Sequence, residues 1–113
     1  MPPSPEQRAE ARRIAREMAK VGFVLPGTVL ERRLTCTHEG CHCHADPPQL
    51  HGPYWYWTRK VAAKTVSRVL SAEQVEEYRP WLDNERRLRA LVRQLEQIGL
   101  QIVEDDPRTP RRR

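Results

Sequence analysis

The stretch Cys36-Thr37-His38-Glu39-Gly40-Cys41-His42-Cys43-His44, followed by His51-Gly52-Pro53, contains all three cysteines and all four histidines of the 113-residue chain. Zinc prefers about four sulfur or nitrogen ligands in a tetrahedron, and short loops between strands can supply them. The spacing Cys36-x4-Cys41-x-Cys43-x7-His51 therefore predicts a structural zinc site with these four residues as ligands.

The choice of the fourth ligand rests on the residues around each histidine. His51 directly precedes Gly52-Pro53, and a turn there would lead the chain back towards the site. His42 lies between two predicted ligands, so its side chain is expected to point away from the metal. His38 and His44 remain alternative ligands.

Other uses of the cysteines fit the sequence less well. A disulfide would leave one cysteine unpaired, and an iron–sulfur cluster usually takes four cysteines. Copper or redox chemistry and the absence of any metal remain open. A catalytic zinc would need an open coordination position, and the chain has neither a glycine-rich phosphate loop nor a recognisable Ser-His-Asp arrangement. We therefore expect a protein that is not an enzyme.

The segments on either side of this stretch predict a helix and three strands. Ser4-Pro5-Glu6-Gln7 is a helix start, and the helix is expected from Glu6 to Lys20 with a stop at Gly22. Residues 28–34 predict a strand that leads into the cysteines. Residues 54–58 and 64–70 predict a hairpin about residues 61–63, although the turn lacks an Asn-Gly pair.

The C-terminal part is expected to be helical. Ser71 and Gln74 repeat the capping pattern, and apolar residues recur at three- and four-residue steps. Pro80 predicts a kink or a restart, with a second helix from Pro80 to Ile98 that ends at Gly99. Its stripe of apolar residues, which includes Trp81, Leu88 and Leu95, forms either the domain core or a seam with a second copy.

Together these elements predict an α+β fold: a small, zinc-stapled, three-stranded antiparallel sheet flanked by an N-terminal helix and a long, Pro-kinked C-terminal helical region. The expected organisation is an N-terminal helix (1–24), a zinc-ribbon-like Cys/His β core (25–70), amphipathic helices (71–100) and a disordered basic tail (101–113). No stretch approaches the roughly 20 apolar residues of a membrane span, and no secretory pattern opens the chain. We expect a cytoplasmic protein.

The charge pattern indicates an anionic partner. The chain has 20 Lys and Arg against 15 Asp and Glu, and residues 54–70 contain four cations and no acid. Phosphate contacts are predicted for these cations and base stacking for two neighbouring rings: Arg59, Lys60, Lys64, Arg68, Tyr56 and Trp57. This predicts binding of DNA or RNA. Alternatively, helices cover both faces of the hairpin, and the Trp81–Ile98 helix dimerises or binds a protein partner.

Three segments resemble a family of small bacterial proteins of unknown function: Cys36 to Cys43, His51-Gly52-Pro53-Tyr54-Trp55-Tyr56, and Lys64-Thr65-x-Ser67-Arg68. The resemblance covers about residues 25–98 and implies Cys36, Cys41, Cys43 and His51 as the metal core. Members are often encoded beside transposase or integrase genes, which implies an accessory role on nucleic acid in mobile-element recombination. The chain departs from the family at residues 37–40, where His38 adds a rival ligand, and at Ala62-Ala63, where relatives favour Asn-Gly.

Overall fold

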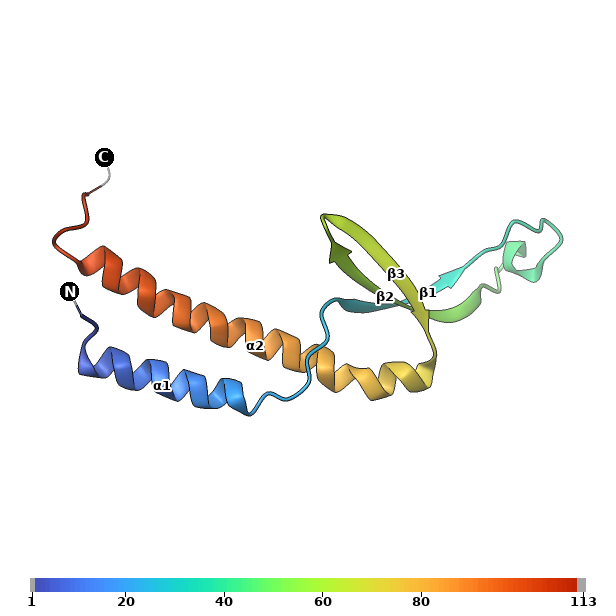
Figure 1. The fold of residues 1–113 in the computed structure, drawn as a ribbon. Helices are drawn as coiled ribbons and strands as arrows, with labels where there is room; N and C mark the ends of the chain where they lie inside the picture. The colour runs from blue at the N-terminus through green and yellow to red at the C-terminus, as the bar shows by residue number, and fades with distance from the viewer. Residues whose placement is uncertain (1, 112–113) are drawn as a thin grey trace. The chain divides into compact units, whose positions relative to one another are not determined.

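The computed structural model describes residues 2–111 and confirms the predicted α+β class. In chain order the elements are α1 (Pro5–Ala19), β1 (Thr28–Leu34), the short 3-10 helix η1 (His42–His44), β2 (His51–Val61), β3 (Lys64–Leu70) and α2 (Ala72–Asp105) (Figure 1). They form two compact units, Met1–Val24 with Asp83–Arg113, and Leu25–Leu82. Among the described residues, no helix combines the length and the apolar character needed to cross a membrane.

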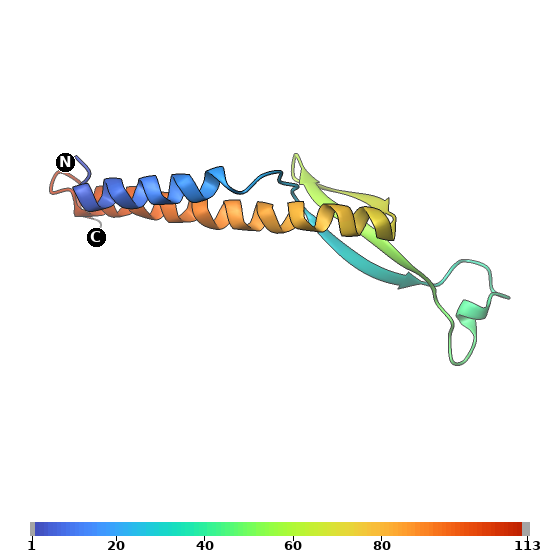
Figure 2. The same ribbon diagram turned by 90° about the horizontal axis from the view of Figure 1, so that it is seen from below.

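The first unit is an antiparallel pair of helices, α1 and the second part of α2, which lie side by side in both views (Figures 1 and 2). The predicted cap of α1 is confirmed, because the Ser4 hydroxyl accepts from the Gln7 N–H while the Gln7 side chain accepts from the Ser4 N–H. Ile14 of α1 and Leu91 of α2 are buried. Arg87 and Glu17 form an ion pair of 2.8 Å between the two helices.

As predicted, the second unit contains a three-stranded antiparallel sheet. Its strand order is β1-β2-β3. A two-residue turn joins β2 to β3, and both of its residues, Ala62 and Ala63, have positive φ (49° and 67°). Gly27, just before β1, also has a positive φ, of 104°. A Cβ at Gly27 would overlap the carbonyl oxygen of Thr58, so this close approach of the chain to β2 requires glycine.

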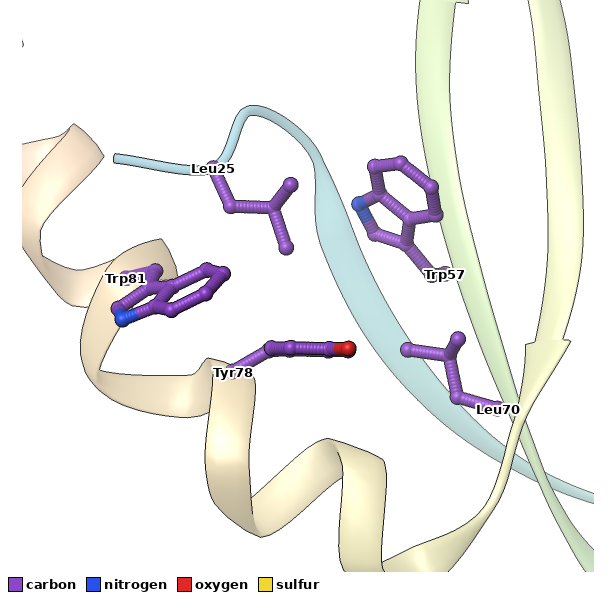
Figure 3. Close-up of a pocket in the computed structure, with 5 residues that line it drawn as sticks. All are labelled: Leu25, Trp57, Leu70, Tyr78 and Trp81. Carbon is purple, nitrogen blue, oxygen red and sulfur yellow. The ribbon is translucent and has the colours of Figure 1, made fainter. Parts of the chain in front are cut away.

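The first turns of α2 supply aromatic residues to the core of the second unit. Tyr78 and Trp81 of α2 point towards Trp57 of β2 and Leu70 of β3, and Leu25 closes the cluster (Figure 3). The Tyr78 and Trp81 rings are 5.0 Å apart. Val75 and Leu82 of the same helix are buried. One face of the sheet is therefore packed against the chain's own aromatic residues.

The C-terminal predictions need two corrections. The chain has one helix from Ala72 to Asp105 that contains Pro80, so no second helix starts there. Buried Val75 and Leu82 flank Pro80 and hold the helix together by packing, despite the backbone hydrogen bond that proline cannot make. Gly99 does not end the helix, because it lacks the positive φ of a glycine cap. Residues 101–105 of the predicted disordered tail are therefore helical, and residues 112–113 lie outside the described residues.

The predicted turn at Gly52-Pro53 is also wrong. Both residues belong to β2, which begins at His51, three residues before the predicted strand. Gly52 has a φ of 118°, and a Cβ there would lie 2.9 Å from the Arg32 carbonyl oxygen. The pairing of β1 with β2 shifts register between Arg32 and Leu34, so this irregularity takes the place of a turn.

Candidate metal centre

The loop between β1 and β2 brings together the four residues that the sequence predicts as metal ligands. Cys36 lies two residues after β1 ends, and His51 is the first residue of β2. Cys41 directly precedes the 3-10 helix η1, and Cys43 lies within it. One ligand atom from each residue can be chosen so that all four atoms lie within 4.8 Å of one another. The site therefore lies at the base of the loop, where the sheet begins.

Two distances inside this cluster are close to those expected around a tetrahedral ion. Thiolates that bind zinc at about 2.3 Å in a regular tetrahedron are separated by about 3.8 Å. The Sγ atoms of Cys36 and Cys43 are 3.6 Å apart, and the Sγ atom of Cys41 is 3.2 Å from Nε2 of His51. A disulfide needs about 2.0 Å between sulfur atoms, and all three cysteines are free. The donor set therefore fits a metal ion better than it fits a disulfide.

Hydrogen bonds and burial shift the pKa values of Cys41 and Cys43 in opposite directions. A hydrogen bond from the backbone N–H of Cys43 lowers the pKa of Cys41. Burial raises the pKa of the Cys43 thiol, whose residue is only 1% exposed. The Cys36 N–H donates to Cys43 Sγ over 3.3 Å, a contact that would favour the thiolate. A bound cation would favour all three thiolates, since the thiolate is the form that binds metal.

The remaining histidines occupy different positions around the cluster. Nε2 of His44 is 2.7 Å from the carbonyl oxygen of Cys36. A carbonyl oxygen can only accept, so Nε2 of His44 carries the proton and donates it. His44 thus supports the backbone of a donor residue, as outer residues of metal sites commonly do. The backbone carbonyl of His38 accepts from the Cys36 thiol over 3.8 Å, and the four-donor group does not include its imidazole.

His42 does not point away from the cluster, contrary to the sequence prediction. Its ring centroid is 5.3 Å from that of His51, and its Nδ1 is 3.7 Å from the Sγ atom of Cys41. The 3-10 conformation of residues 42–44 turns the side chain towards this side of the loop. The prediction rests only on the position of His42 between two ligands, and the sequence has no marker for the 3-10 turn.

The six predicted nucleic-acid contacts do not lie on one surface. The strand register places Arg59, Lys64 and Arg68 on the same face as Trp57, whereas Tyr56 and Lys60 lie on the opposite face. Trp57 is half-buried, its indole N–H donates to the Pro26 carbonyl oxygen over 2.9 Å, and the Arg59 guanidinium is 5.1 Å from its ring centroid. Its ring is therefore part of the packing of the second unit. The four cations are all exposed.

Comparison with known proteins places the chain in one family. Residues 5–80 match the family described as a domain of unknown function, DUF6788, and the chain belongs to it. The match includes α1, all four clustered donors and the hairpin, whereas the resemblance from the motifs covers about residues 25–98. No curated protein and no solved structure matches the chain.

Proposed function

We propose that this member of the DUF6788 family is a non-catalytic nucleic-acid-binding protein whose fold is held by a structural zinc ion. The observation that carries the zinc assignment is the convergence of three thiols and one imidazole within 4.8 Å. Sulfur and nitrogen donors in tetrahedral spacing suit zinc. Four protein donors would also leave no open position for a reacting water, which supports a structural role.

The zinc would stabilise the loop that it closes. A long loop without regular structure loses conformational freedom when the chain folds, and residues 35–50 contain only the three-residue helix η1. Three thiolates require reducing conditions to stay free, and this supports the cytoplasm as the compartment. A structural zinc site does not by itself identify a binding partner, which is argued from the charge of the hairpin.

The nucleic-acid assignment is supported by the charge of the hairpin. Residues 54–70 hold four exposed cations and no acidic residue. Phosphate attracts such a segment over several ångströms, and the affinity then falls with salt. DNA and RNA carry the same phosphates, so either nucleic acid can make these contacts.

The zinc assignment is tested by metal content per chain, measured by mass spectrometry on untagged protein. About one zinc per chain is expected, with loss of zinc and of folded circular dichroism in Cys36→Ser and Cys43→Ser. Metal-free protein with stable cysteine variants would overturn the assignment.

The charge assignment is tested by reversing Arg59, Lys60, Lys64 and Arg68 to Glu and by measuring DNA and RNA affinity over a salt series. We expect weaker binding and a shallower dependence on salt. The matched control reverses four arginines of the first unit that form no ion pair in the described part of the chain: Arg8, Arg12, Arg16 and Arg93. This control changes the net charge by the same amount as the hairpin variant. Equal losses of nucleic-acid affinity in both variants would therefore contradict a specific contact by the hairpin cations.

A protein-interaction module is the second candidate. Leu100 and Val103 of α2 are 58% and 54% exposed, whereas Leu91 is buried in the helix pair. Exposed apolar residues on a helix can bind another helix. Light scattering that shows a tight dimer, together with no detectable binding of nucleic acid, would favour this candidate over the first.

A further inference from the structure

The two faces of the β1-β2-β3 sheet have different surroundings. Side chains alternate along each strand, and paired residues share a face. The register therefore places Leu30, Arg32, Tyr54, Tyr56, Lys60 and Val69 on one face, which we call the open face. Leu30 and Val69 are 53% and 59% exposed, and Tyr54 is 39% exposed. These large side chains remain accessible although they belong to paired strands.

Part of the opposite face packs against the unit's own core, although Arg59, Lys64 and Arg68 on that face are exposed. Trp57 and Leu70 point from it towards Tyr78 and Trp81 of α2 (Figure 3). The Trp57 ring on that face is consequently engaged within the second unit. An aromatic contact between this sheet and a partner would use the open face.

The two tyrosines of the open face have a spacing that suits successive bases. Tyr54 and Tyr56 are two residues apart on β2, and a strand rises about 3.3 Å per residue, which separates them by about 6.6 Å. Sheet aromatics at such positions stack on unpaired bases in several nucleic-acid-binding folds. The Arg32 guanidinium lies 5.7 Å from the Tyr56 ring centroid, so a planar cation adjoins this ring.

Charge on the open face favours a polyanion. The register places ten residues there, and none is acidic: Thr28, Leu30, Arg32, Tyr54, Tyr56, Thr58, Lys60, Thr65, Ser67 and Val69. Arg32 and Lys60 form no ion pair within the described part of the chain. A second copy of this face would bring like charges together, which disfavours self-association. Phosphates would pair with both cations.

We propose that the open face binds single-stranded nucleic acid, with bases stacked on Tyr54 and Tyr56 and phosphates paired with Arg32 and Lys60. The inference rests on the proposed nucleic-acid binding and names the surface and the form of the ligand. A duplex hides the faces of its bases in the stack, whereas unpaired bases offer them to side-chain rings. Arg32 and Tyr54 add contacts that the sequence alone did not indicate.

The metal centre lies at one end of this surface. Arg32 pairs with Tyr54, and the next paired positions along the strands are Leu34 and His51, of which His51 is itself one of the four donors. A metal bound there would fix the strand ends that position the Arg32–Tyr54 pair. Zinc would thus act as a positioning element for the open face and would not contact the nucleic acid.

The test measures the affinity of zinc-loaded, full-length protein for labelled oligothymidylate and for a duplex of equal length by fluorescence anisotropy. Single strands are expected to bind more tightly than the duplex. Tyr54→Ala and Tyr56→Ala should each weaken binding of the single strand by about 5- to 150-fold. Tyr54→Phe and Tyr56→Phe keep the ring and are the matched controls, expected to bind within about twofold of the parent. Zinc content and thermal stability show whether each variant is folded.

Nuclear magnetic resonance of the unsubstituted protein supplies a measurement that does not depend on the variants. Oligothymidylate should shift the amide and side-chain signals of Leu30, Tyr56 and Val69 more than those of Val66 on the opposite face. Unchanged signals on the open face, or alanine variants that bind as well as the parent, would overturn the proposed surface. If the proposed surface failed in this way but charge reversal of the hairpin still abolished binding, nucleic-acid binding would stand and only the assignment to the open face would be lost. Failure of the unsubstituted protein to bind any nucleic acid would overturn both.

Discussion

Leu34, the last residue of β1, pairs with His51, the first residue of β2, and this pair closes the loop that carries the cysteines. Cys36 follows the pair by two residues on one side, while His51 itself supplies an imidazole on the other. The loop between Cys36 and His51 folds back, so that Cys41 and Cys43 lie beside these two residues. Sheet register and donor geometry are therefore linked in this protein.

Removal of metal with a chelator is expected to loosen this end of the sheet. Binding energy of a structural zinc contributes directly to folding, so the metal-free protein should melt at a lower temperature. Hydrogen exchange should rise most at residues 34–51, with the amides of α1 as the internal reference. Identical exchange with and without chelator would contradict the link between the loop and the metal.

Replacement of His44 by Ala is expected to weaken the site without removing a ligand. The change deletes the hydrogen bond to the Cys36 carbonyl oxygen, which should cost about 0.5–1.5 kcal/mol of unfolding free energy. Chemical denaturation of the zinc-loaded protein measures this loss. His38→Ala is the control, because its exposed imidazole forms no hydrogen bond in the described part of the chain. A loss of stoichiometric zinc in His38→Ala would contradict the exclusion of the His38 imidazole from the four donors.

The turn between β2 and β3 is expected to gain stability when Ala62→Asn and Ala63→Gly are combined. Both alanines have positive φ, a conformation that costs an ordinary residue about 1–2 kcal/mol. Asn and Gly tolerate it, so the midpoint of chemical denaturation should rise. Ala63→Val, a β-branched residue at the same position, should lower it. A gain in stability from Ala63→Val would be inconsistent with a positive φ at this position.

Gly99→Ala is expected to stabilise the protein, because Gly99 lies inside α2 and a Cβ there meets no atom within 4 Å. Alanine in place of an interior helical glycine contributes about 0.5–1 kcal/mol. Gly27→Ala is the opposite control and should lower stability, since it combines a positive φ with overlap of Thr58. Thermal melts of the two variants compare them directly. Destabilisation by Gly99→Ala would indicate that the helix ends at this residue.

Local patterns in the sequence predict much of this fold. Ser4 and Gln7 start α1 and Ser71 and Gln74 start α2, because each capping box involves only residues three positions apart. The strands and the set of four converging donors also follow from local spacing. The structure brings His51 into this cluster although the predicted turn after it does not form.

Features that depend on distant residues could not be predicted in this way. The continuation of α2 through Pro80 depends on the packing of Val75 and Leu82. The different surroundings of Tyr56 and Trp57 depend on which sheet face meets α2, and alternation alone does not decide this. The orientation of His42 depends on the 3-10 turn, for which the sequence has no marker.

X-ray absorption at the zinc edge of the untagged, zinc-loaded protein tests the central claim most directly, because it reports the atoms bound to the metal. The account predicts about three sulfur neighbours at about 2.3 Å and one nitrogen at about 2.0 Å. His51→Ala should remove the nitrogen contribution and leave the three sulfur atoms. A spectrum without sulfur neighbours, or one that His51→Ala leaves unchanged, would contradict the site formed by Cys36, Cys41, Cys43 and His51.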